Sequence, residues 1–160
     1  MSSQVLSAQQ LLQDSGLQAF IRLLRSHAAV TRELSARLEA RHGLTLSDYD
    51  VLVQLYFAPE RALRRVDLAR TVLLTASGIT RLLDGLEREG WVEKRACASD
   101  ARVTYAALTE DGVRRFEAAQ SSHRQHVEEL FASKFSEGER AQLAELLGRL
   151  PLANAGACNA

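Results

Sequence analysis

The segment from Val66 to Leu108 constrains the fold more than any other part of this chain. A short helix is expected from Val66 to Arg70, and Thr75 is the expected N-cap of a second helix. The second helix carries one apolar stripe at helical spacing, formed by Ile79, Leu82, Leu83 and Leu86. Gly90 is a typical helix stop. The segment therefore predicts two successive helices joined by a turn.

A hairpin is expected directly after the second helix. Residues 91–96 and 102–108 have strand composition, and a polar tip from Cys97 to Ala101 joins them. In the second strand, alternation predicts one face formed by Val103, Tyr105 and Ala107. Helix, turn, helix and hairpin in this order predict a winged helix-turn-helix, which offers a helix to the major groove of DNA and a loop to a neighbouring groove.

Long helices flank this segment on both sides. Apolar residues at three- and four-residue steps predict a helix from Leu17 to Arg41, with Gly43 as its stop. Such a helix would be roughly 37 Å long at 1.5 Å per residue. Because this length exceeds what a small core needs, the helix is expected to pack against a partner.

Polar residues mark the limits of the remaining elements. Ser47 with Asp50 resembles a capping box for the helix that Pro59 ends, and Ala62 to Arg64 is a candidate third strand. Thr109 is the expected N-cap of a second long helix. Ser136 and Glu139 form a capping box for the last helix, whose stripe is Leu143, Leu146, Leu147 and Leu150.

We expect a mainly α fold, with a winged helix-turn-helix head, a small β-hairpin wing and long N- and C-terminal dimerisation helices. The 160 residues are expected to form one domain. Its head spans about residues 45–108, its dimerisation helices about 5–42 and 109–150, and its flexible tail 151–160. Apolar positions in excess of one small core are expected at the subunit interface, among them Val5, Leu6, Leu11, Leu12, Leu143 and Leu147.

The charge is balanced overall but uneven along the chain. Residues 61–102 carry nine basic and six acidic side chains, whereas the formal net charge of the whole chain is zero. Eighteen of the twenty basic residues are Arg, which suits contacts with phosphate and guanine, although genome base composition explains this bias equally well. The positive excess therefore falls on the predicted head.

Composition and motifs argue against several other classes of protein. No apolar run reaches the length of a membrane span, and the first residues lack the pattern of a signal peptide, so we expect a cytoplasmic protein. Two cysteines, Cys97 and Cys158, do not form a disulfide framework. Nucleotide-binding, metalloprotease and nucleophile-elbow motifs are absent, so we expect neither an enzyme nor a cofactor.

The face of the second helix opposite its apolar stripe carries Ser77, Arg81, Asp84 and Arg88, flanked by Thr80. Ser and Thr are short enough to let a helix enter a groove, and Arg is the commonest reader of guanine edges. The alternative is an ordinary amphipathic surface helix, but the succession of turn, helix and wing favours DNA binding.

Two charged residues define the expected wing contact. Asp100 and Arg102 are two residues apart, so both side chains can point to one side of a strand. An Arg at a hairpin tip can enter a minor groove, where negative potential attracts guanidinium. Asp100 would then brace Arg102, and the alternative is a solvated ion pair of little value.

The stretch S-G-I-T-R-L-L-D-G-L-E-R-E-G-W-V-E-K-R, followed by D-A-R and by A-L-T-E-D-G, resembles the MarR family of bacterial transcriptional regulators. The resemblance spans roughly residues 17–150 and is strongest over 66–112. It implies a homodimer that binds a pseudo-palindromic operator in double-stranded DNA. It further implies a repressor that a small aromatic or phenolic ligand releases.

The resemblance also assigns residues. The recognition helix falls on Thr75 to Glu89, the D-x-R wing signature on Asp100 and Arg102, and the L-T-x-x-G start of the next helix on Leu108, Thr109 and Gly112. The expected DNA-contacting residues are Thr75, Ser77, Thr80, Arg81, Arg95 and Arg102, with Asp100 as wing support. This sequence departs from the family in its short wing tip, which has few basic residues, and in Asp84, which would limit the approach of the later helix turns to DNA.

In the family, the effector pocket lies between the dimerisation helices and the head. By position, its candidate residues here are Arg22, Arg25, His27 and Tyr49. A metal site is not expected, because no Cys or carboxylate completes a ligand set with His123 and His126.

Two other functions remain open from the sequence. A winged-helix protein-interaction module without DNA binding would fit the zero net charge and Asp84. A redox-sensing regulator would use Cys97, whose basic neighbours favour a reactive thiolate.

Overall fold

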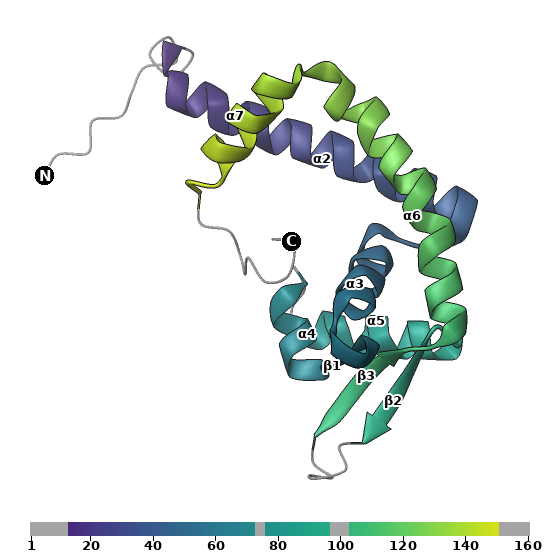
Figure 1. Cartoon of the computed structure of the whole chain (residues 1–160). Helices are drawn as coiled ribbons and strands as arrows, with labels where there is room; N and C mark the ends of the chain where they lie inside the picture. Colours follow the sequence, from purple (N-terminus) through teal and green to yellow (C-terminus); the bar gives the residue numbers. More distant parts are fainter. Residues whose placement is uncertain (1–12, 73–75, 97–102, 151–160) are drawn as a thin grey trace, which may run out of the picture. The chain divides into compact units, whose positions relative to one another are not determined.

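The computed structural model describes residues 13–72, 76–96 and 103–150, without the side chains of residues 76 and 77. It contains two compact units, Met1–Glu33 and Leu34–Ala160. The helices are α2 (Ser15–His42), α3 (Leu46–Phe57), α4 (Arg65–Thr71), α5 (Ala76–Arg88), α6 (Glu110–Leu130) and α7 (Glu137–Leu147). The short 3-10 helices η1 (Pro59–Arg61) and η2 (Ala132–Lys134) and the strands β1 (Ala62–Arg64), β2 (Val92–Ala96) and β3 (Thr104–Leu108) complete the described elements (Figure 1).

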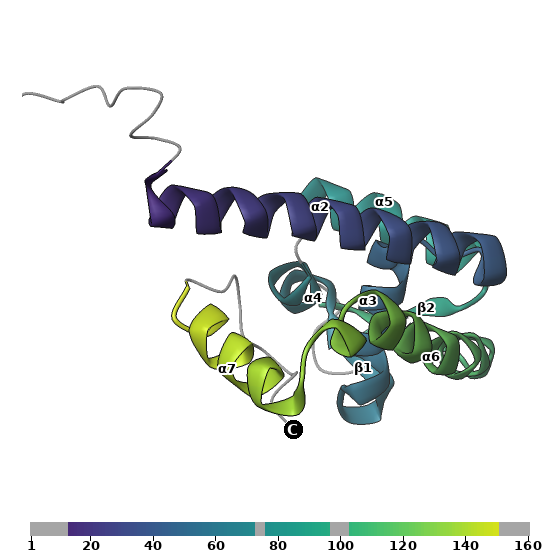
Figure 2. The same cartoon turned by 90° about the horizontal axis from the view of Figure 1, so that it is seen from above.

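The second unit holds the predicted winged helix-turn-helix. Helices α4 and α5 contact each other and are followed by the β2–β3 hairpin, so the mainly helical fold expected from the sequence is confirmed. Helices α3 and α6 lie side by side in both views (Figure 1, Figure 2) and contact each other along the head. Within the described ranges, no helix is long and apolar enough to cross a membrane.

The sheet is antiparallel, with strand order β1-β3-β2. Pairing of Ala62–Arg64 with β3 confirms the candidate third strand, while β2 and β3 begin one and two residues later than expected. Successive side chains of β3 point to opposite faces, but burial does not alternate with them, because Ala106, Ala107 and Leu108 are all buried. As the central strand, β3 contacts α3, α4 and α6, so helices cover residues that would face solvent on an edge strand.

A single cluster of apolar side chains forms the core of the second unit. It joins all the head helices to the sheet and to α6, and its fully buried large members are Phe116, Leu38, Leu44, Leu52, Leu55, Leu68, Leu83, Leu86 and Val51. The rings of Tyr49 and Tyr56 pack against Phe116 from α3. The core therefore holds α5 and the sheet in fixed positions on one scaffold.

Helix α3 begins earlier than the sequence analysis predicts. Its N-cap is Thr45, whose hydroxyl accepts a hydrogen bond from Asp48 N at 3.1 Å, while Thr45 N donates to the Asp48 carboxylate at 2.8 Å. The capping box of Ser47 with Asp50 is therefore wrong, because an equivalent Thr and Asp pair stands two residues earlier. Ala58, the residue before Pro59, is extended, which ends the helix as expected.

The caps of the last two helices are confirmed. The Ser136 hydroxyl accepts a hydrogen bond from Glu139 N, and the Glu139 carboxylate accepts one from Ser136 N at 2.8 Å. The hydroxyl of Thr109 accepts a hydrogen bond from Gly112 N at 3.0 Å at the start of α6. These hydrogen bonds satisfy donors that the first helical turn leaves unpaired.

Hydrogen bonds connect the end of α5 to the start of α6. Gly90, with φ of 74°, closes α5 by donating to Glu87 O, while Trp91 N donates to Leu86 O at 3.0 Å. Thr109 is hydrogen-bonded to both Gly90 and Trp91. Its N donates to Trp91 O at 3.1 Å, and its hydroxyl donates to Gly90 O at 2.7 Å. These hydrogen bonds form one junction between the last turn of α5, Trp91 just before β2 and the first turn of α6.

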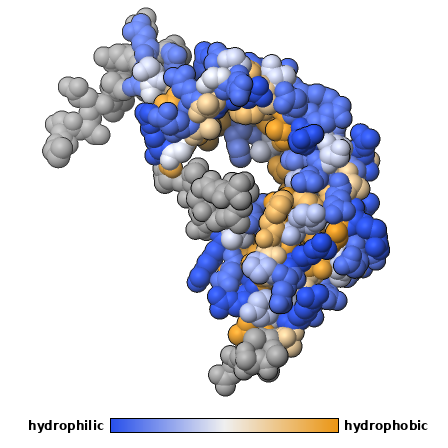
Figure 3. Space-filling model, in the orientation of Figure 1, coloured by the Kyte–Doolittle hydropathy of each residue, from blue (hydrophilic) through white to orange (hydrophobic). Residues whose placement is uncertain are grey.

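Apolar side chains remain exposed on the two helices predicted to mediate dimerisation. Helix α7 has no buried residue, and Leu146 and Leu150 are each nearly half exposed. Apolar side chains come to the surface among polar ones over α7 and the neighbouring part of α6 (Figure 3). On α2, the predicted stripe members Phe20, Leu23 and Leu24 are exposed, and its buried residues are Leu34 and Leu38.

Candidate nucleic-acid interface

Helix α5 has the amphipathic arrangement that the sequence predicts. Ile79, Leu83 and Leu86 are buried, and Leu82 packs against the same core with partial exposure. The opposite side presents exposed Thr80 and Arg81 in the first half of the helix, and exposed Asp84 and Arg88 in the second half. The core therefore fixes which face of α5 is turned to solvent.

Arg81 is the cation that α5 presents most freely. Its side chain is exposed, and within the described part of the chain it forms no hydrogen bond and no ion pair. By contrast, Arg88 is turned back along the helix, where its Nε donates to the carbonyl of Asp84 at 3.2 Å. Arg81 can therefore approach a base edge without first giving up a protein contact.

Several predicted site residues lie outside the described residues. Thr75, Asp100 and Arg102 are among them, as is Cys97, so the N-cap of α5, the wing signature and the redox candidate remain predictions. Ser77 lies in the first turn of α5, and its side chain is not described. The structure thus brings together Thr80, Arg81 and the backbone of Ser77.

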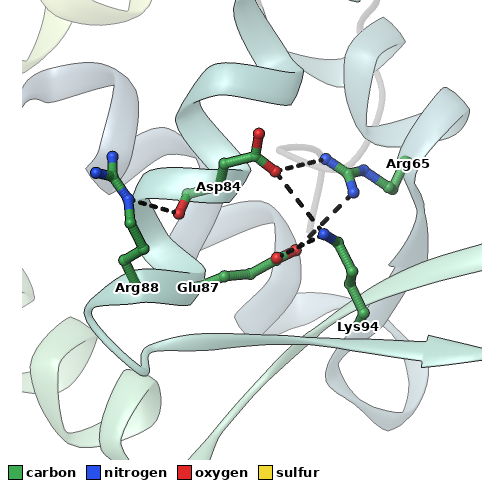
Figure 4. Close-up of polar contacts among 5 residues, drawn as sticks. All are labelled: Arg65, Asp84, Glu87, Arg88 and Lys94. Carbon is green, nitrogen blue, oxygen red and sulfur yellow. Dashed lines mark hydrogen bonds and ion pairs between the residues drawn. The ribbon is translucent and has the colours of Figure 1, made fainter.

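Asp84 has charged neighbours on two other elements. Its carboxylate faces Arg65 of α4 at 3.6 Å and Lys94 of β2 at 3.9 Å (Figure 4). Its negative charge is therefore balanced by two cations beside the helix. The expectation that Asp84 limits the approach of the later turns of α5 to DNA stays a prediction, and this pairing adds two neighbouring cations to it.

Glu87 completes the same group of charges, which we call the α5 charge cluster: Arg65, Asp84, Glu87 and Lys94. Glu87 faces Lys94 at 3.0 Å and Arg65 at 3.9 Å (Figure 4). Arg65, Glu87 and Lys94 were not predicted as a group from the sequence. The available signal was a pair of acids at i and i+3 on α5, with basic residues on both neighbouring elements.

Arg95, the predicted contact at the end of the first wing strand, is half exposed. Its Nε donates to the Glu93 carboxylate at 2.8 Å, and both side chains lie in solvent. Such a surface pair contributes little stability and exchanges readily. Because successive residues of a strand point to opposite faces, Arg95 lies on the face of the sheet opposite Lys94. The structure therefore leaves Arg95 accessible at the base of the wing.

The four residues predicted for an effector pocket belong to both units. Arg22, Arg25 and His27 are exposed on α2 in the first unit. Tyr49 is buried in the second unit, where its ring centroid is 4.4 Å from that of His123 and 5.6 Å from that of Phe116. Burial raises the pKa of Tyr49 to about 12, so its hydroxyl is protonated at neutral pH.

Histidines gather where α6 passes the end of α2. His42 Nε2 and the Ser122 hydroxyl are 2.6 Å apart, and burial lowers the pKa of His42, with further lowering by nearby Arg41 and Arg115. Burial likewise lowers the pKa of His123. Within the described residues, no three His, Cys, Asp or Glu side chains lie together as a metal site requires.

Comparison with known proteins agrees with this architecture. The family model described as "MarR family" matches residues 42–103, which cover most of the head. The HTH-type transcriptional regulator MhqR of Bacillus subtilis is 28% identical over 139 residues, covering 87% of this chain and 93% of that protein. The uncharacterized HTH-type transcriptional regulator YdgJ of the same organism is 31% identical over 121 residues, covering 76% and 72%.

A solved structure shows the same fold. Sco3205, a MarR family transcriptional regulator from Streptomyces coelicolor crystallised in complex with DNA, superposes with a TM-score of 0.80 at 24% identity. The superposition covers 92% of this chain and 88% of that one. These matches cover most of this chain and most of the relatives, and the chain belongs to the MarR family of transcriptional regulators.

Proposed function

We propose that this chain is a dimeric DNA-binding transcriptional regulator, a repressor released by a small aromatic or phenolic ligand. The observation that carries DNA binding is the exposed guanidinium of Arg81, which lies next to Thr80 on the solvent face of α5 and forms no hydrogen bond or ion pair with the residues that the structure describes. Arg81 and Thr80 would read base edges in the major groove, together with Ser77 and Thr75 at the start of the helix.

The wing would supply the second contact. Arg102, braced by Asp100, would enter the adjacent minor groove, and Arg95 would bind phosphate at the base of the wing. Asp84 was one reason to consider an interaction module without DNA binding. Because Arg65 and Lys94 balance its charge, that reason loses weight.

A dimer is supported by the apolar surface of α7. The helix has no buried residue, its apolar Leu146 is exposed, and so are Leu150 just after α7 and Phe131 just after α6. Isolated helices of this length are unstable unless an apolar face is covered. A second copy would cover this surface and hold two recognition helices about 34–36 Å apart, the spacing of successive major grooves.

The effector would bind near the helices outside the head. Arg22, Arg25 and His27, which are exposed on α2, are candidates to hold a carboxylate or phenolate. Alanine substitution of Arg22 or Arg25 tests this assignment, since it should abolish release from DNA by the effector without changing operator affinity. Loss of operator affinity in the same variants would refute it.

Selection of bound DNA from a random pool tests the proposed function. We expect an inverted repeat whose half-sites are about one helical turn apart, bound by a dimer. Repression is then checked by placing the recovered sequence over a reporter promoter. Recovery of no enriched sequence at moderate salt would refute DNA-specific regulation.

A further inference from the structure

We propose that Glu87 is a positioning residue that fixes the orientation of the wing relative to helix α5. It does so by facing Lys94 of β2 and Arg65 of α4 at once (Figure 4). This inference rests on the proposed function and adds to it a residue that reads no base. Its role is to let α5 and the wing reach neighbouring grooves together.

The α5 charge cluster joins three elements. Asp84 and Glu87 lie one turn apart on α5, so both carboxylates project from the same flank of the helix. Arg65 is the first residue of α4, and Lys94 is the middle residue of β2. Each acid faces both cations, so the four side chains form a closed ring of alternating charge.

Glu87 is the acid on which this ring depends most. Its side chain is 18% exposed, against 51% for Asp84, and it lies closest to Lys94, at 3.0 Å. Glu87 Oε1 and Arg65 Nη2 are buried and have no hydrogen-bond partner among the described residues. Because partly buried charges are screened weakly by salt, loss of Glu87 would leave Arg65, whose side chain is 22% exposed, with Asp84 as its remaining partner in the cluster.

The wing needs such a fixed connection because of its place in the sheet. Strand β2 is an edge strand, so one of its sides is not held by a neighbouring strand. Lys94 lies on the face of β2 that is turned to α5, and it stands only six residues before Asp100. The Glu87–Lys94 pair therefore connects the reading helix to the strand that leads into the wing tip.

The direction in which DNA affinity changes when Glu87 loses its charge distinguishes a positioning role from simple electrostatic repulsion of phosphates. Glu87 is an acid on the proposed DNA-reading helix, so removing its charge should by itself strengthen attraction to phosphates. A positioning role predicts the opposite for an operator that the wing also contacts. The isosteric variant Glu87→Gln therefore distinguishes the two accounts by the direction of the affinity change.

The test compares two DNA duplexes made from the operator recovered by selection. The full duplex includes the flanking minor-groove steps, and the truncated duplex ends at the major-groove half-sites. We expect Glu87→Gln to bind the full duplex about fivefold more weakly and the truncated duplex as tightly as wild type or tighter. Glu128→Gln is the matched control, since Glu128 of α6 forms an exposed ion pair with Arg140 of α7.

Exchanging the charges of residues 87 and 94 is a second test of the proposal. Its conclusion does not depend on whether one particular variant folds. Lys94→Glu alone should lose most binding to the full duplex, and Glu87→Lys combined with Lys94→Glu should restore at least half of the lost free energy. Equal or tighter binding of the full duplex by Glu87→Gln would overturn the proposal. A double variant no better than Lys94→Glu would overturn it as well.

A measurement without DNA keeps this proposal separate from the proposed function. In the free protein, Glu87→Gln should speed amide hydrogen exchange in residues 92–96 while exchange in α3 stays unchanged, as expected when a local connection is lost. Unchanged exchange in β2 would overturn the positioning role. Failure of the wild-type protein to bind any selected DNA would instead refute the proposed function.

Discussion

The carbonyl oxygen of Trp91 lies 2.1 Å from the position that a Cβ on residue 112 would occupy, so only glycine fits at Gly112. The same Cβ would also approach Leu108 Cδ1 at 2.7 Å. This close approach places the first turn of α6 against the junction that Thr109 forms with Gly90 and Trp91. The final glycine of the L-T-x-x-G pattern thus has a packing reason in this chain.

Gly112→Ala should destabilise the protein by at least about 3 kcal/mol, because backbone atoms cannot yield as a flexible side chain can. Urea unfolding followed by circular dichroism measures the change. Gly138→Ala is the control, since nothing lies within 4 Å of its Cβ position in α7. That substitution should be neutral or stabilising by up to about 1 kcal/mol, and equal losses in both variants would contradict the packing argument.

Arg81→Ala should reduce discrimination between operator and scrambled DNA by about 1–3 kcal/mol, as expected for loss of a bidentate base contact. Its stability should change by less than about 0.5 kcal/mol, because the exposed side chain forms no hydrogen bond or ion pair with the described residues. Mobility-shift titrations measure the specificity ratio, and Arg124→Ala on α6 is a matched exposed control. An unchanged ratio would refute base reading by Arg81.

Arg102→Ala should weaken operator binding and reduce the slope of log K against log salt by about 0.9 per lost phosphate contact. A shallower slope is expected because fewer counterions are released when the wing makes one ionic contact less. Titrations between low and moderate salt give the slope directly. The same slope in the variant and in wild type would count against a contact between Arg102 of the wing and DNA.

Leu146→Glu should convert the dimer to a monomer, because it places a charge on the exposed apolar face of α7. Light scattering after gel filtration measures the mass, and operator affinity should fall with dimer content. Gln142→Glu adds the same charge at an exposed polar position of α7 and should leave the mass unchanged. A dimeric Leu146→Glu variant would place the interface elsewhere.

Stability should fall as pH drops below the ordinary histidine pKa of 6.5, because burial lowers the pKa of both His42 and His123 in the folded state. The unfolded chain then binds more protons, and each such site contributes a slope of at most about 1.4 kcal/mol per pH unit. This contribution to stability is complete above pH 6.5 and is lost as the pH falls further.

Urea unfolding between pH 7.5 and 5 at fixed protein concentration measures this dependence. His123→Gln should flatten the curve on the acidic side, and His27→Gln, which removes an exposed imidazole, is the control. The same acid sensitivity in His123→Gln and wild type would exclude His123 as a cause.

Local patterns in the sequence predicted most of the elements of the head. The stripe from Ile79 to Leu86 gave the face of α5, since helical periodicity depends only on neighbours along the chain. Thr109 and the pair Ser136 and Glu139 were assigned correctly as caps for the same reason. Two overlapping polar pairs, Thr45 with Asp48 and Ser47 with Asp50, could each cap the start of α3. Only the backbone geometry distinguishes them.

Features that depend on distant elements were not predictable in this way. The burial of Ala106, Ala107 and Leu108 follows from helices packed over a central strand, which alternation along the strand cannot indicate. Asp84 was placed correctly on α5, but its partners Arg65 and Lys94 come from two other elements. Sequence spacing therefore located the candidate reading face and missed the charges that surround it.

The junction at Thr109 has a mechanical consequence for α6. This helix has 21 residues, and its first turn is hydrogen-bonded to the residues that end α5 and precede β2. No flexible linker separates them, so we expect α6 and the head to move together as one rigid body. A tilt imposed at the far end of α6 would reach α5 and the hairpin as a rotation of both together.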